Sequence, residues 1–356
     1  MAPSSDPYGD YIEHLDYYYY EILTTDNFDF TLSHPPGERT VFQVYAAAFC
    51  TLIFCISLPG NSFLLWVLLK ERAWRTTHDI FLLQLAVSNL CSTTTLPFMA
   101  SNALNSWVFG WTACGAVRGF FFLGMNSYPI IVTAMVLHSY ITVVHASRVS
   151  AQAFSKRRVL VGSIVMWLPC AAVSIRDSMD SVAIPLGEDE MCTGVESAYS
   201  MTVSVSLGMT LFFLLPLAII TFCYVHLWIT IRQGRINRQD QPSKLILGIT
   251  VGYFLCVALH HITLLMNSLY LVNIFRSTAY LTHTVHCLMF ISYPLTHFYC
   301  LLYPLFYIPG AQRFRRHLPQ RCQRNRDDSS VALVNLLETC EDEDMIVCHA
   351  LTSRTS

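Results

Sequence analysis

The stretch FQVYAAAFCTLIFCISLPGNSFLLWVLL, residues 42–69, contains no Asp, Glu, Lys or Arg along its whole length. A helix needs about 20 predominantly apolar residues to cross the hydrocarbon core of a bilayer. Only helices and closed barrels satisfy their backbone groups in that environment, and this block is too long for a barrel strand. The stretch therefore predicts a transmembrane helix.

Six further apolar blocks follow along the chain, at residues 80–104, 113–144, 159–175, 201–231, 245–272 and 278–308. Hydrophobic residues make up 53% of the 356 residues and charged residues only 13%, against about 25% charged residues in soluble domains. We predict an all-α membrane protein in which residues 42–308 form a seven-transmembrane helix bundle.

The distribution of Lys and Arg predicts the orientation of this bundle, because cytosolic loops of membrane proteins are enriched in both residues. Of the 22 basic residues, only four fall in segments that share a side with the amino terminus: Arg39, Arg118, Arg176 and Arg276. We therefore expect a multi-pass protein of the plasma membrane, with its amino terminus extracellular and its carboxyl terminus cytoplasmic.

The segment before the first block, residues 1–41, is acidic and rich in tyrosine. High charge with few aliphatic residues predicts a disordered extracellular tail. Tyrosines among acids are typical of extracellular sulfation, and such a tail would attract a basic protein ligand and raise its association rate. The candidate ligand-capture residues are Tyr8, Tyr11, Tyr17, Tyr18, Tyr19, Tyr20, Asp10, Glu13, Asp16 and Glu21. The alternative is a solvated tail that only keeps the terminus outside.

The segment after the last block is basic. Residues 309–318 predict a short amphipathic helix on the cytosolic membrane surface, and residues 319–356 predict a disordered cytoplasmic tail. Cys322 follows the basic run and is a palmitoylation candidate; the alternative is an ordinary stop-transfer flank with an incidental cysteine.

Short motifs stand in a fixed order along the blocks: Gly60-Asn61, Leu85-Ala86-Val87-Ser88, Thr95-Leu96-Pro97-Phe98, Trp107-Val108-Phe109-Gly110 with Cys114, Trp167, Pro216 with Tyr224, Phe254-Leu255-Cys256, and Pro304 with Tyr307. The set resembles rhodopsin-like (class A) G-protein-coupled receptors over the whole membrane portion. The Thr-x-Pro and Trp-x-Phe-Gly motifs, and the Phe-Arg-Arg-His-Leu run at 314–318, are similar to those of chemokine receptors. The resemblance implies a cell-surface receptor for an extracellular basic, chemokine-type protein or related peptide. A heterotrimeric G protein and arrestin are its candidate partners, besides membrane lipids.

Two cysteines fall on the outer side in this topology. Cys114 opens the third helix and Cys192 lies in the second outer loop, so we expect a disulfide between them in an oxidising compartment. The usual second bridge of chemokine receptors is not expected, because residues 1–49 contain no cysteine. The proposed ligand pocket consists of Met99, Trp107, Arg118, His261 and Tyr293. For Arg118, a side chain that extends to the lipid headgroups is an equal alternative.

The activation switch of the family is altered at most of its positions. The third helix ends in His138-Ser139-Tyr140 where the family has Asp-Arg-Tyr, and Asn89 stands where it has a sodium-binding aspartate. Val257 and Leu259 stand at the positions of a pivoting tryptophan and a kink-forming proline. The predicted switch positions are Asn89, His138, Ser139, Tyr140, Tyr224, Val257, Leu259, Tyr303, Pro304 and Tyr307.

These departures predict weak or absent G-protein coupling, as in atypical receptors that internalise chemokine without signalling. Two alternatives remain open. One is a conventionally signalling receptor, which the loss of restraints would make constitutively active. The other is a partner of another receptor that binds no ligand itself.

Other classes of function find no support in the sequence. Histidines occur in the last two blocks, but their spacing favours pocket lining over a metal site. The last lysine of the chain is Lys244, so the seventh block has none that would bind retinal. We expect no cofactor, no enzymatic nucleophile and no nucleic-acid binding.

Overall fold

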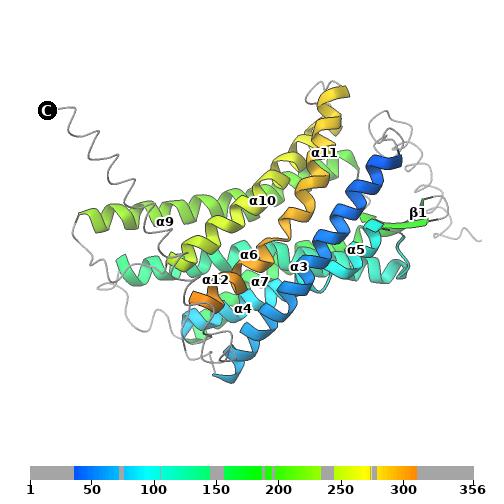
Figure 1. Ribbon diagram of the computed structural model, residues 1–356. Coiled ribbons are helices and arrows are strands. Elements are labelled where there is room, and N and C mark those ends of the chain that lie inside the picture. The colour runs from blue at the N-terminus through cyan, green and yellow to red at the C-terminus, as the bar shows by residue number, and fades with distance from the viewer. Residues whose placement is uncertain are drawn as a thin grey trace, which may run out of the picture.

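The computed structural model describes residues 36–71, 76–104, 106–144, 156–186, 189–194, 197–233, 244–272, 274 and 279–310. Within these ranges it contains seven helical spans that are long and apolar enough to cross a membrane. Figure 1 shows them packed side by side as one bundle. The predicted fold class is therefore confirmed.

Four of the spans are single helices: α3 (Pro36–Lys70), α6 (Gly110–Val144), α7 (Lys156–Met179) and α10 (Lys244–Leu271). The other three are interrupted. The second span comprises α4 (Thr77–Thr93) and α5 (Leu96–Leu104). The fifth span comprises α8 (Ala198–Met209), the π-helical turn η2 (Thr210–Leu214) and α9 (Leu215–Arg232). The seventh span comprises α11 (Ala279–Thr296) and α12 (Tyr299–Gly310). Each span lies within a few residues of the apolar block that predicted it.

Proline accounts for the break in the second span. Pro97 has no N–H to donate to the carbonyl of Thr93, and its ring crowds that carbonyl. Helix α4 accordingly ends at Thr93. Just after it, the side-chain hydroxyl of Thr94 donates to Cys91 O at 3.0 Å and that of Thr95 donates to Ser92 O at 2.7 Å. The seventh span is interrupted after Thr296, two residues beyond Pro294, where the backbone makes shorter-range bonds from His297 N to Pro294 O at 3.2 Å and from Phe298 N to Leu295 O at 3.0 Å.

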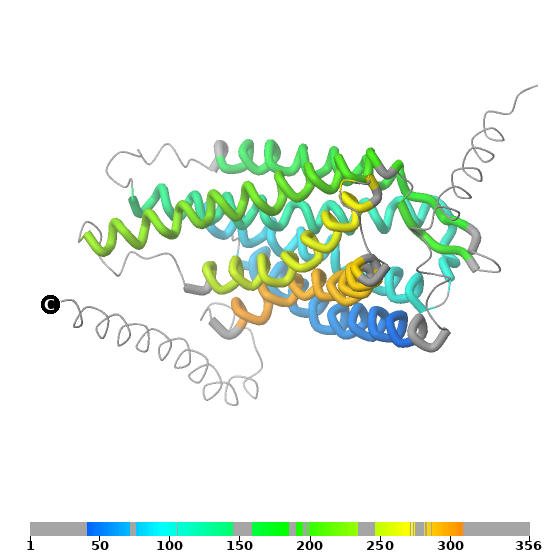
Figure 2. Tube along the Cα trace, turned by 90° about the horizontal axis from the view of Figure 1, so that it is seen from above, coloured from blue at the N-terminus to red at the C-terminus, as the bar shows by residue number. Residues whose placement is uncertain are grey.

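A β-hairpin lies at one end of the bundle, beside α5, and the end of α12 lies at the other (Figure 1). The strands of this hairpin, β1 (Ser181–Leu186) and β2 (Asp189–Gly194), pair antiparallel, with Ala183 opposite Cys192. We call the two ends of the molecule the hairpin end and the opposite end. Both views place α3 beside the seventh span (Figure 2).

The polarity of the bundle is that of a membrane protein. On α7, five apolar side chains are 53–63% exposed: Leu160, Val161, Ile164, Val165 and Leu168. The interior instead buries many polar groups, among them Asn61, Asn89 and Ser92, none of which is measurably exposed. An apolar outer surface with polar residues inside suits lipid as the surrounding solvent.

Candidate ligand site and switch region

The hairpin is fixed to the helices by the predicted disulfide. Cys114 near the start of α6 is bonded to Cys192 of β2, with 5.6 Å between their Cα atoms. Trp107 lies beneath the hairpin and is 2% exposed. Its backbone N donates to Glu190 O at 2.6 Å and its indole Nε1 to Gly110 O at 2.8 Å. Trp107 therefore supports the hairpin from below.

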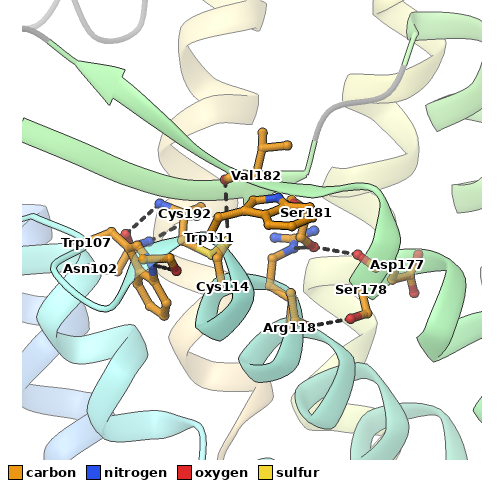
Figure 3. The surroundings of a disulfide bond; sticks show 12 residues. Asn102, Trp107, Trp111, Cys114, Arg118, Asp177, Ser178, Ser181, Val182 and Cys192 are labelled. Atoms are coloured by element: carbon orange, nitrogen blue, oxygen red, sulfur yellow. Dashed lines mark hydrogen bonds between the residues drawn. A yellow bond between two sulfur atoms is a disulfide. The ribbon is translucent and has the colours of Figure 1, made fainter. Parts of the chain in front are cut away.

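Two further contacts hold the hairpin, as Figure 3 shows. The Asn102 side chain of α5 donates to Cys192 O at 3.2 Å and accepts from Cys192 N at 3.0 Å. Arg118 of α6 donates from Nε to Ser181 Oγ at 2.8 Å, and its guanidinium lies 5.4 Å from the ring centroid of Phe122. Arg118 thus points towards the base of β1 inside the bundle and not along the lipid-facing surface.

A cluster of rings lies below the hairpin between the second, third, sixth and seventh spans. Tyr293 of α11 is at its centre, with its ring centroid 6.2 Å from Phe121 and 5.6 Å from His260. The Tyr293 hydroxyl donates to Sδ of Met99 at 3.5 Å. His297 stacks on Phe121 at 5.1 Å. The predicted pocket residues Met99 and Tyr293 are therefore in direct contact.

His261 extends this cluster to the fifth span. Its ring stacks on Phe213 of η2 at 5.1 Å, and its Nδ1 is 3.0 Å from Val257 O, the acceptor one turn earlier. The neighbouring His260 lies 3.3 Å from Ser292 Oγ through Nδ1. The histidines thus engage hydroxyl and carbonyl groups, and no group of three or more metal-ligating side chains is present among the described residues.

A network of polar side chains joins α3, α4 and α12 in the middle of the bundle. Asn61 donates through Nδ2 to Ser57 O and Cys300 O, both at 3.0 Å. Its Oδ1 accepts from Asn89 Nδ2 at 3.0 Å. Oδ1 of Asn89 is buried with no partner among the described residues. Asn89 therefore serves as a neutral donor to its neighbour.

Three tyrosines fill the space beside this network. Tyr128, Tyr253 and Tyr299 come from α6, α10 and α12, and each is at most 1% exposed. The Tyr128 centroid lies 4.8 Å from each of the other two, and the Tyr253 and Tyr299 centroids are 5.6 Å apart. Tyr299 shares a hydrogen bond of 2.7 Å with Ser92 Oγ. The sequence did not single out these tyrosines, although aromatic hydroxyls in apolar helices are a signal of buried contacts.

At the opposite end, the third span is tied to the fifth. The Tyr140 hydroxyl and His226 Nδ1 are 3.2 Å apart. The neighbouring Ser139 donates to Met135 O of its own helix at 2.9 Å, and His138 packs edge-on against Phe81 at 6.0 Å. None of His138, Ser139 and Tyr140 therefore provides the long cationic side chain of an arginine at this end.

The remaining switch positions lie in the sixth, fifth and seventh spans. Val257 is fully buried, whereas Leu259 is 39% exposed on the outer surface of α10. The Tyr224 hydroxyl is buried with no partner among the described residues. Tyr303 and Tyr307 contact each other at 5.1 Å, and the Pro304 ring lies so close to α3 that a Cβ on Gly60 would meet it at 2.7 Å.

The ten candidate capture residues of the tail, Tyr8 to Glu21, lie outside the described residues, as do the rest of residues 1–35, the amphipathic helix beyond residue 310 and Cys322, whereas residues 36–41 belong to α3. Their predicted roles stay predictions.

The sequence of this chain is similar to those of known receptors. The model of the 7 transmembrane receptor (rhodopsin family) matches residues 60–307. The chain belongs to this family. It is 31% identical to Chemokine XC receptor 1 of Homo sapiens over 301 residues, which cover 83% of this chain and 87% of the relative. It is 27% identical to C-C chemokine receptor type 8 of Homo sapiens over 364 residues, 96% of this chain and 95% of the relative. Atypical chemokine receptor 2 of Mus musculus is 27% identical over 282 residues, 78% and 74% of the two chains.

Membership makes the chain a G-protein-coupled receptor-like protein and not an enzyme, and it implies a multi-pass protein of the plasma membrane. The predicted resemblance to chemokine receptors is confirmed.

Proposed function

We propose that this receptor captures a chemokine-type protein or related peptide at the cell surface and couples weakly or not at all to G proteins. The hairpin end faces outside, because this orientation leaves most basic residues in the cytosol. Two of the relatives are named Chemokine XC receptor 1 and C-C chemokine receptor type 8, which supports the ligand class. The acidic tyrosine-rich segment 1–41 supports capture of a basic protein.

The observation that carries the weak coupling is the environment of Ser139. Its hydroxyl is used within α6 by the bond to Met135 O, so it offers no side chain to a protein docked at the cytosolic end. The resemblance implies an arginine at this position, and an arginine presents five donors on a long stem. Losing it removes the principal group that would meet the G protein.

The sixth span supports the same inference. Helix α10 runs from Lys244 to Leu271 without proline, and Leu259 stands where the resemblance implies the kink. A helix without a proline keeps all its backbone hydrogen bonds and resists sharp bending. Val257 offers a small side chain in place of a large ring. The helix movement that opens a G-protein site therefore lacks both the proline kink, at Leu259, and the large aromatic ring, at Val257.

The test combines ligand uptake and signalling in intact cells. Fluorescent XC, C-C and C-X-C chemokines are applied to cells that display the receptor with an amino-terminal tag, and G-protein dissociation is recorded in parallel. We expect saturable uptake of at least one chemokine, reduced when Tyr17–Tyr20 are changed to Phe, with little G-protein response.

A full G-protein response to the internalised chemokine would contradict weak coupling and favour the conventionally signalling receptor. No uptake despite clear surface display would contradict the chemokine proposal and favour a role as a partner of another receptor. Ser139→Arg, with Ser139→Ala as its matched control, tests the proposed cause: only the arginine should raise coupling.

A further inference from the structure

The ring cluster below the hairpin has an open surface. Tyr293 is 37% exposed although its neighbours Phe121 and His297 are almost fully buried. The contacts of Tyr293 come from α5, α6 and α10, so its partly exposed ring lies between these helices.

The helices around this space contain no acid. Neither Asp nor Glu occurs anywhere in α5, α6, α10 or α11, which supply Met99, Phe121, His260 and Tyr293. Their basic residues are Arg118 near the hairpin and Lys244 at the far end of α10. The fixed charge nearest to the cluster on these helices is therefore positive.

The histidines of the cluster make hydrogen bonds to hydroxyl and carbonyl groups. His297 is fully buried and lies 3.0 Å from Tyr293 O through Nδ1, while its Nε2 has no partner among the described residues. His260 is engaged with Ser292 and His261 with Val257. The cluster thus offers ring faces, a phenol and imidazole nitrogens, which suit apolar and neutral polar groups.

The described acids on the hairpin side are Asp177 in the last turn of α7, Asp180 just after that helix, and Asp189 and Glu190 of β2. In the sequence, residues 1–41 add eight acids against the single base Arg39. An acidic rim attracts a basic protein surface. A cationic group that moves past these acids into the ring cluster would lose its water shell, and α5, α6, α10 and α11 offer it no carboxylate in exchange, which is costly.

We propose that the pocket around Tyr293 admits the tip of a ligand only when that tip carries no positive charge. Acylated or cyclised amino termini and aromatic loops fit, whereas a free amino-terminal ammonium does not. The ligand class is therefore a protein with a basic body and an uncharged tip. This inference rests on the proposed capture of a chemokine-type protein and specifies which end group that protein presents.

The test uses XC, C-C and C-X-C chemokines, each synthesised with a free amino terminus and with an N-acetylated one, in a competition assay on intact cells. We expect the acetylated form of the bound chemokine to bind the receptor about tenfold more tightly than the free amine, equivalent to one unit in log Kd. Equal or tighter binding of the free amine overturns the proposal and shows that attraction of the cation to the ring faces prevails. Failure of both forms of every chemokine overturns the proposed function itself.

A second test changes the charge of the receptor pocket instead of the charge of the ligand. Tyr293→Glu places a carboxylate in the pocket, and we expect the preference to reverse towards the free amine. Tyr293→Phe is the matched control, which keeps the ring and adds no charge, and should still prefer the acetylated form. If Tyr293→Glu fails to reach the surface, the comparison of the two ligand forms on the unchanged receptor decides the proposal. A surface-displayed Tyr293→Glu receptor that keeps the original preference contradicts it.

Discussion

The side-chain amide of Asn102 pairs with both backbone polar groups of Cys192, donating to the carbonyl at 3.2 Å and accepting from the N–H at 3.0 Å. An amide side chain offers the same donor and acceptor as a peptide group, so Asn102 occupies the place of a third strand against β2. The disulfide of Cys192 and this amide together fix one residue of the hairpin to both α6 and α5.

Replacing Asn102 by Ala should loosen the hairpin without breaking the disulfide. Two hydrogen bonds in a half-buried place are lost, at a cost of about 1–3 kcal/mol. Hydrogen exchange of the Cys192 amide, measured by mass spectrometry on the purified receptor, should accelerate markedly.

Asn102→Asp is the matched variant for this prediction. Its carboxylate still accepts from Cys192 N but cannot donate to Cys192 O, so the amide should keep most of its protection. Equal exchange in all three proteins would show that the disulfide alone fixes this strand.

The sequence predicted the bundle because its signal is local. A block such as residues 42–69 carries its own evidence for a membrane span, whatever lies beside it. The disulfide was predictable for a related reason: the topology puts Cys114 and Cys192 on one side of the membrane, in an oxidising compartment.

The interior contacts were not predictable in the same way. Nothing in the spacing of Tyr128, Tyr253 and Tyr299 shows that they meet, because each comes from a different helix and the rotation of each helix is set by packing. Asn102 was missed because its partner is backbone, which leaves no pattern in the sequence. Trp107 was assigned to the pocket from its place in the loop, yet the structure buries it beneath the hairpin.

Sodium should not stabilise this receptor. The three-tyrosine cluster is joined to α4 through the bond of Tyr299 to Ser92, and the Asn89 amide on the same helix supplies no negative charge and is already bonded to Asn61. The midpoint of thermal unfolding in detergent should be the same in NaCl as in choline chloride at equal ionic strength. A saturable rise of the midpoint with sodium would refute this.

Restoring the acid alone should not create a sodium site. In Asn89→Asp a carboxylate would face the Asn61 Oδ1 that now accepts a hydrogen bond. A buried, unpaired charge costs several kcal/mol, so we expect a lower unfolding midpoint than in Asn89→Ala and still no response to sodium. A sodium-dependent recovery of the Asp variant would show that the tyrosines leave room for the ion.

The closeness of α4 and α6 depends on Gly124. A Cβ built there would meet Ser88 O at 2.6 Å, and Ser88 Oγ donates to Gly124 O at 2.9 Å. Gly124→Ala should therefore push the two helices apart and break this bond, at a cost of about 1–3 kcal/mol. The expected results are a lower unfolding midpoint and less receptor at the cell surface.

Gly162 of α7 provides the matched control, because a Cβ there meets no atom within 4 Å. Alanine has the higher helix propensity, by about 1 kcal/mol, so Gly162→Ala should be neutral or slightly stabilising. The contrast between the two variants separates steric exclusion from helix propensity. Similar stability in both would mean that α4 and α6 move apart at little cost, and that the buried serines between them contribute little to the packing of the bundle.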